Sequence, residues 1–321
     1  MGNPLLITDH QVVAARGPKN AVDRERPYAF LVEGERSAAG IVEPVATLFL
    51  TNRECPLRCV YCDLWKNTTD VRAKTGNIPR QIDFALKRLP PARHIKLYNS
   101  GNFFDPQAIP REDLPAIGHR VCGFATVVVE NHPIFCDEHC VDFRRRLEGE
   151  LEVAIGLETV DPDVLPRLNK RMTPDDFSRA AGFLRGHDIQ LRAFVLLKPP
   201  FCTDELAAVD WAVRSVEFAI SHGVRCCSII PTRGGNGIME QLDRDGLFSP
   251  PKLESLEAAI DACLGLSAVS SGAVRVFADL WDIERLASCR QCVGRRIERL
   301  RQLNSSQQPL PEIACGCGDE V

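Results

Sequence analysis

Residues 45–62 read VATLFLTNRECPLRCVYC, a short apolar run followed closely by three cysteines. The run Val45–Thr51 is rich in apolar and β-branched residues, which predicts a strand buried on both faces. Cys55, Cys59 and Cys62 then follow on a loop at the carboxyl end of that strand. Thiolates are ligands of iron–sulfur clusters and of zinc, so this loop is predicted to wrap a metal centre.

Strands and helices alternate along the chain after this loop. A helix after residue 173 is predicted by Thr173 as its N-cap and Pro174 as its first residue, and a helix over 204–220 is predicted with Thr203 as its cap. Such alternation predicts an α/β fold with a parallel sheet, either open or closed into a partial barrel, in which ligands gather at the carboxyl ends of the strands. The other predicted strands are 95–98, 125–129, 151–157, 191–197 and 224–230, and the other predicted helices are 79–89 and 251–264.

Composition narrows the class of protein. The chain has 321 residues, a net charge of −4, 45% hydrophobic residues and 14 cysteines, which excludes a disordered chain or a disulfide scaffold. No basic region followed by an apolar run opens the sequence, and no apolar stretch reaches about 18 residues. We therefore expect a cytoplasmic protein with no membrane contact, whose clustered cysteines stay reduced and bind metal. The slight negative charge gives no general argument for nucleic acid.

The cysteine loop resembles that of the radical S-adenosylmethionine (radical SAM) superfamily. The resemblance rests on the spacing Cys-x3-Cys-x2-Cys, on Tyr61 before the last cysteine, and on the preceding strand, and it extends over roughly residues 44–282. It implies a partial (β/α)6 barrel of the TIM type. It also implies a [4Fe–4S] cluster on Cys55, Cys59 and Cys62, with one iron left open for SAM. A structural zinc loop is the alternative.

The resemblance also implies the chemistry. An electron donor such as flavodoxin or ferredoxin would reduce the cluster, and one electron would cleave SAM to methionine and a 5′-deoxyadenosyl radical. That radical would abstract hydrogen from a substrate. The stretches YNSGNFFDP (98–106), PTRGGNG (231–237) and FADLWD (277–282) resemble a subgroup near the archaeosine tRNA lyase and, more distantly, the Elongator catalytic subunit.

The same resemblance implies where SAM binds. Ser100, Gly101 and Asn102 follow the second strand of the repeat, at the place that receives the SAM amino group. Glu130 follows the third strand and would face SAM or substrate, and Glu158 follows the fourth and would suit the ribose hydroxyls. The residues expected to bind the cofactor are Tyr61, Ser100, Gly101, Asn102, Glu130, Glu158, Arg192 (paired with the SAM carboxylate or with Glu158), and Ile229 and Pro231 beside the adenine.

A second group of cysteines closes the chain. Cys289-x2-Cys292 and Cys315-x-Cys317 form two close pairs, a pattern typical of a tetrahedral zinc site, with an auxiliary iron–sulfur cluster as the alternative. Between the pairs lies a basic segment, 294–303, whose arginines at 295, 296, 299 and 301 would either face solvent or contact RNA phosphates. The expected domains are an N-terminal extension over 1–44, the barrel over 45–282 and a metal-binding tail over 283–321.

The prediction is thus a radical SAM enzyme acting on an unidentified substrate such as a tRNA nucleoside or a small metabolite. Two other functions stay open at this point. One is a non-catalytic, zinc-containing RNA-binding protein, which the arginine-bearing tail favours. The other is an enzyme that cleaves a different S–C bond of SAM.

Overall fold

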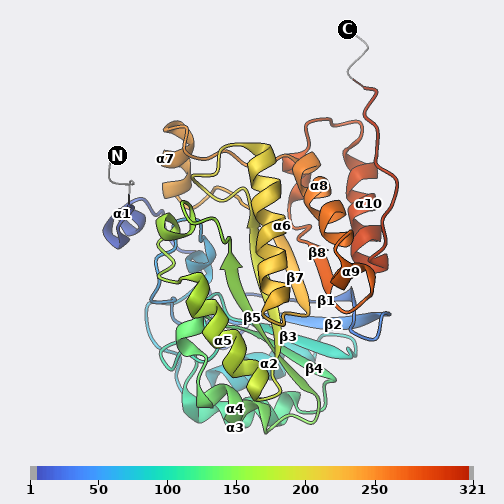
Figure 1. The fold of residues 1–321 in the computed structure, drawn as a ribbon. Coiled ribbons are helices and arrows are strands. Elements are labelled where there is room, and N and C mark those ends of the chain that lie inside the picture. The colour runs from blue at the N-terminus through green and yellow to red at the C-terminus, as the bar shows by residue number, and fades with distance from the viewer. Residues whose placement is uncertain (1–5, 318–321) are drawn as a thin grey trace.

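One curled sheet forms the centre of the molecule. The computed structural model describes residues 6–317, and within them the sheet is a half-barrel of eight strands in the order β1 to β8 (Figure 1). Strand β1 runs antiparallel to β2, and each later strand runs parallel to its neighbour. This confirms the predicted α/β fold with a partial barrel.

The helices follow the strands in the order expected of repeated strand–helix units. No helix in the described part of the chain is both long and apolar enough to cross a membrane. The strands are β1 (Ala29–Arg36), β2 (Val42–Phe49), β3 (His94–Tyr98), β4 (Thr126–Glu130), β5 (Glu150–Glu158), β6 (Gln190–Leu197), β7 (Cys226–Pro231) and β8 (Arg275–Ala278). The helices are α1 (Asp9–Ala14), α2 (Asn77–Leu86), α3 (Leu114–Val121), α4 (Glu138–Arg144), α5 (Pro174–Gly186), α6 (Glu205–Ser221), α7 (Ile238–Arg244), α8 (Leu253–Leu264), α9 (Ser267–Ser270) and α10 (Val293–Ser306).

The six predicted strands correspond to β2 through β7, and the sequence prediction missed β1 and β8. Strand β1 carries charged residues and is half-exposed along most of its length, so it lacks the apolar run that marks a central strand. Strand β8 is only four residues long. Because β1 pairs with β2 along its whole length, residues 29–36 belong to the sheet and are not a separate extension.

Helix caps show where local sequence decides the structure. Thr173 caps α5 as predicted, in a reciprocal capping box with Asp176, and Pro174 begins the helix. The predicted cap Thr203 of α6 is wrong, because the Asp204 side chain accepts the N–H of Ala207 and takes that role.

The two faces of the sheet differ in chemistry, because successive side chains of a strand point to opposite faces. Apolar side chains such as Leu48, Leu97 and Val195 are fully buried in the main hydrophobic core. On the opposite, concave face, Tyr98 packs edge-on against Phe194, with ring centroids 6.2 Å apart, although their strands are not neighbours. The concave face therefore carries the polar and aromatic groups.

Helix α10 covers the free edge of β8 with two side-chain amides. Asn304 accepts the N–H of Ala278 at 2.8 Å and donates to its carbonyl at 2.9 Å. Gln307 accepts the N–H of Val276 at 2.7 Å and donates to its carbonyl at 2.8 Å. These amides occupy the positions that a ninth strand's backbone would take.

Candidate active site and metal centres

The cysteine loop follows β2, as predicted, and other strand ends hold it in place. Val60 is fully buried, and its N–H donates to the Leu168 carbonyl at 3.0 Å. The Asn236 amide donates to the carbonyls of Val60 at 2.7 Å and of Cys62 at 3.1 Å. The loop is therefore fixed at the carboxyl ends of the strands, where ligands bind in this kind of fold.

The three loop thiols suit an iron–sulfur cluster. All three are half-buried, and the Asn102 amide donates to the Cys55 sulfur at 3.2 Å. Burial raises the pKa of Cys59 to about 11, although the Lys170 ammonium partly offsets this. Three cysteines on one loop supply three of the four thiolate ligands that a [4Fe–4S] cluster takes.

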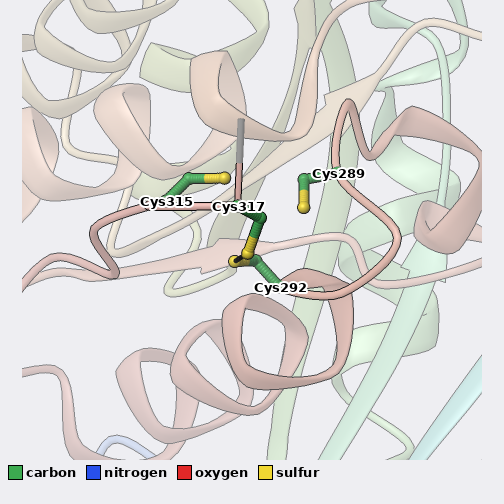
Figure 2. Close-up of side chains that lie close together, drawn as sticks. All are labelled: Cys289, Cys292, Cys315 and Cys317. Carbon is green, nitrogen blue, oxygen red and sulfur yellow. Dashed lines mark hydrogen bonds between the residues drawn. The ribbon is translucent and has the colours of Figure 1, made fainter. Parts of the chain in front are cut away.

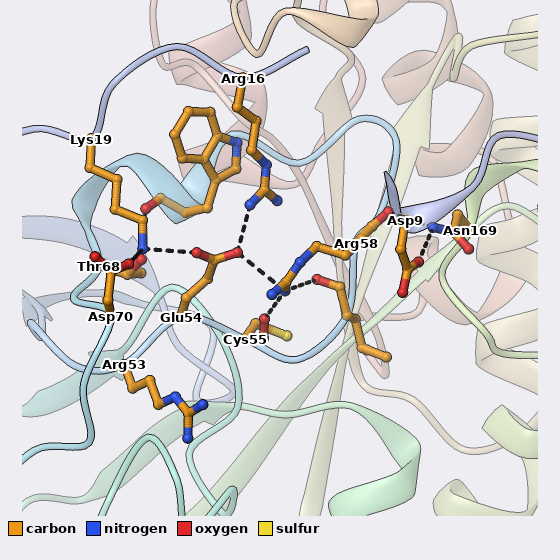
Figure 3. A network of polar contacts seen from close by, with 12 residues as sticks. Asp9, Arg16, Lys19, Arg53, Glu54, Cys55, Arg58, Thr68, Asp70 and Asn169 are labelled. Carbon is orange, nitrogen blue, oxygen red and sulfur yellow. Dashed lines mark hydrogen bonds and ion pairs between the residues drawn. The ribbon is translucent and has the colours of Figure 1, made fainter. Parts of the chain in front are cut away.

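The residue before Cys55 anchors the loop electrostatically. Figure 3 shows the Glu54 carboxylate surrounded by Arg16 at 2.6 Å, Lys19 at 2.8 Å and Arg58 at 3.1 Å. Arg58 also donates to the Cys55 carbonyl. Arg16 and Lys19 belong to the segment before β1, so their ion pairs with Glu54 join that segment to the cysteine loop.

Glu130 lies at the end of β4 and faces the loop after β3. Its Oε1 accepts the N–H of Asn99 at 2.6 Å and of Gly101 at 3.2 Å. Burial raises the pKa of Glu130 to about 7, against the lowering effect of these N–H groups. The structure thus brings Glu130 together with the predicted Ser100–Asn102 segment.

Glu158 forms a buried ion pair that the sequence did not reveal. Lys170 lies 2.5 Å from the Glu158 carboxylate and 3.4 Å from the Tyr61 hydroxyl. A Cβ on Gly156 would lie 2.0 Å from Glu158 Oε1 and 2.5 Å from Lys170 Nζ, so the pair occupies space that only glycine leaves free. Burial lowers the pKa of Lys170, but Glu158 and Cys59 outweigh this effect, so its pKa is raised and the ammonium stays charged.

Arg192 does not pair with Glu158, which was one of the two partners expected for it. It bonds Glu152 at 2.5 Å and Glu35 at 2.7 Å, whereas Glu158 pairs with Lys170. Glu35 also bonds Lys96, and both cations hold the pKa of Glu35 well below its usual range against the effect of burial. Arg192 therefore belongs to a buried charged layer between β1, β3, β5 and β6.

Ile229 faces away from the predicted site. It is fully buried in the core on the helix-covered side of β7, whereas its neighbours Ser228 and Ile230 are half-buried. The burial of Ile229 on this face of the strand does not favour the expected contact with the adenine. Pro231 ends β7, buried and paired in register with Leu197.

The tail cysteines converge on one point (Figure 2). The sulfurs of Cys289, Cys292, Cys315 and Cys317 all lie within 4.8 Å of one another. Thiolates about 2.3 Å from a tetrahedral zinc ion stand about 3.8 Å apart, so this spacing suits a single ion. Backbone N–H groups of Cys292 and Gln291 lower the pKa of Cys289 to about 7.

Two of the four predicted RNA-facing arginines are buried in ion pairs. Arg296 bonds Glu257, and Arg299 bonds Asp261 at 2.8 Å and the Leu310 carbonyl at 2.7 Å. These arginines fasten α10 to α8, which removes half of the basic surface on which the RNA reading rests.

The sequence analysis also missed Tyr28. Its hydroxyl lies 2.9 Å from the Ser100 hydroxyl, at the loop after β3. Neither Lys170 nor Tyr28 directly follows a predicted strand, so the strand-end rule did not select them as site residues.

Comparison with known proteins bears on the fold. No protein-family model matches the chain. It is 23% identical over 250 residues to the uncharacterized protein MJ0550 of Methanocaldococcus jannaschii, covering 73% of this chain and 68% of that protein. It is 27% identical over 191 residues to archaeosine synthase subunit beta of Methanosarcina acetivorans, covering 55% of this chain and 53% of that protein.

Solved structures share the fold. SuiB of Streptococcus suis bound to S-adenosylmethionine matches with a TM-score of 0.55 and 12% identity over 75% of this chain and 52% of SuiB. Elp3 of Methanocaldococcus infernus matches with a TM-score of 0.52 and 14% identity over 81% of this chain and 63% of Elp3. The chain thus spans about half the length of SuiB and of the archaeosine synthase subunit. Its fold is that of the radical SAM enzymes, which confirms the resemblance at the level of the fold.

Proposed function

We propose that this protein is a radical SAM enzyme. The observation that carries the proposal is the loop of Cys55, Cys59 and Cys62, which is fixed at the carboxyl ends of the strands and receives the Asn102 amide on the Cys55 sulfur. These thiolates would hold a [4Fe–4S] cluster with one iron open. When bound, cluster and SAM supply reductive cleavage of SAM to a 5′-deoxyadenosyl radical, which abstracts hydrogen from the substrate.

The chain's own residues would bind and orient these groups. Asn102 donates to the Cys55 sulfur, and such donors tune a cluster and hold its ligand in place. The Lys170 ammonium faces Cys59 from within the protein. Ser100, Gly101 and Glu130 form the polar edge where the SAM amino group would bind, and Tyr61 closes the site beside the Glu158–Lys170 pair.

The test is anaerobic reconstitution with iron and sulfide, followed by dithionite and SAM. We expect oxygen-sensitive cluster absorption and formation of 5′-deoxyadenosine. Cys59→Ala should lose both cluster and cleavage, whereas Cys122→Ala, a change outside the loop, should keep both. A protein that binds a full cluster and never cleaves SAM contradicts the proposal, and methylthioadenosine as the product would show that another S–C bond is cleaved.

We propose zinc for the tail site, because its four sulfurs are spaced for one ion. Metal analysis of anaerobically purified protein should find about one zinc besides the cluster iron. Zinc without iron would instead support the non-catalytic zinc protein, and a second set of iron and sulfide would support an auxiliary cluster.

We propose that the substrate is a tRNA nucleoside, and this class should be tested before small metabolites. One relative is named for archaeosine synthesis, and the resemblance of 98–106 and 231–237 points to the same subgroup. SuiB was solved with a precursor peptide, so a peptide is the competing class. Consumption of SAM that is stimulated by tRNA and not by peptide would support a tRNA nucleoside.

Flavodoxin or ferredoxin is the proposed electron donor, and a reducing cytoplasm is the proposed compartment.

A further inference from the structure

Two of the three tyrosines of the chain, Tyr28 and Tyr61, contact residues of the proposed active site. Tyr61 contacts Lys170, and Tyr98 packs against Phe194 on the concave face. Tyr28 has no role in the mechanism described so far, although its hydroxyl contacts Ser100 in the loop after β3.

The position of Tyr28 is fixed by the strand beside it. Its backbone N–H donates to the Phe49 carbonyl at 2.9 Å, and its ring centroid lies 5.6 Å from that of Phe49. The hydroxyl then meets the Ser100 hydroxyl at 2.9 Å. Ser100 lies in the left-handed region, with φ +52°, within the segment expected to hold the SAM amino group. The Tyr28 phenol is therefore held next to the segment that is expected to bind SAM.

The surroundings keep this phenol neutral. Burial raises the pKa of Tyr28 to about 12, and the negative charges of Glu130, Asp63 and Cys62 act in the same direction. A neutral phenol carries a transferable hydrogen atom, because the phenoxyl radical left behind is delocalised over the ring. Aliphatic hydroxyls such as that of Ser100 form no such stabilised radical.

We propose that Tyr28 donates a hydrogen atom to a carbon radical formed in this site, an inference that rests on the proposed function. The O–H bond of Tyr28 breaks, a C–H bond forms, and a phenoxyl radical remains. One electron and one proton restore the phenol. The electron comes from a low-potential one-electron carrier protein, the class of donor that also reduces the cluster, and the proton comes from water. A turnover that uses Tyr28 therefore consumes two electrons.

The experiment uses the reconstituted full chain with SAM alone, so that the 5′-deoxyadenosyl radical itself is the probe. Cleavage is run in D2O with dithionite and no added thiol, because a thiol would also donate deuterium. The phenol O–H exchanges with D2O, so wild-type 5′-deoxyadenosine should carry one solvent-derived deuterium. Freeze-quenched samples should show a tyrosyl radical whose electron paramagnetic resonance spectrum changes when ring-deuterated tyrosine is incorporated.

Tyr28→Phe should lose both the deuterium and the radical signal, while its iron and sulfide content and melting temperature stay at wild-type values. Tyr98→Phe is the matched control and should keep the signal. Equal deuterium in wild type and Tyr28→Phe overturns the role of Tyr28 alone. Absence of 5′-deoxyadenosine from cluster-loaded wild type overturns the proposed function, and this inference with it.

Discussion

Replacing Glu130 with glutamine should flatten the pH dependence of the protein's stability. Burial raises the pKa of Glu130 to about 7 from an ordinary value of 4.5. Between these values the folded protein holds a proton that the unfolded chain has released, so stability falls as pH rises. The full contribution is present below the unfolded pKa and is lost as pH passes the folded pKa. Such a shift is worth about 3 kcal/mol, most of it lost between about pH 5 and pH 8.

The assay is urea unfolding of wild type and Glu130→Gln from about pH 5 to pH 8, with equal iron and sulfide in both proteins. The glutamine oxygen can still accept the N–H groups of Asn99 and Gly101, so the fold should be kept. Wild type should lose about 2–3 kcal/mol more than the variant across this range. Parallel pH curves for the two proteins would refute the reasoning. Glu138→Gln, which changes an exposed carboxyl, should follow wild type.

Three further outcomes are expected. Lys170→Met leaves Glu158 buried without its partner and should cost about 3–5 kcal/mol in urea unfolding, and Glu158→Gln in the same chain should recover much of this. Ile229→Ala should cost about 2–5 kcal/mol through a core cavity, while the Kd for SAM measured by calorimetry stays unchanged. Cys292→Ser should release the tail metal, measured as zinc per chain, and leave the cluster iron in place, whereas loss of cluster iron would contradict two separate centres.

Local signals in the sequence located the elements well. Thr173 and Pro174 placed the start of α5 correctly, because a cap acts on the backbone of its own helix. Apolar runs placed β2 through β7, because the face of each strand that packs against the helices is apolar even where the concave face carries charges. Strand β1 was not predicted, because it lies at the edge of the sheet and its charged residues interrupt any apolar run.

The site was predictable only as far as the strand ends. Glu130 and the Ser100–Asn102 segment come together because parallel strands end at the same edge. The partner of Glu158 was not predictable, because Lys170 lies within a loop and does not directly follow a strand. The face on which Ile229 lies was not predictable either, because a shift of one residue in a strand moves a side chain to the opposite face.

The amides of Asn304 and Gln307 on β8 also bear on self-association. An uncovered strand edge is a template on which another copy of the chain can add its own strand. Helix α10 prevents this. One of the two cysteine pairs precedes this helix in the sequence and the other follows it, and their four sulfurs lie close together. The helix that begins directly after Cys292 thus also keeps the edge of the sheet from pairing with a second copy of the chain.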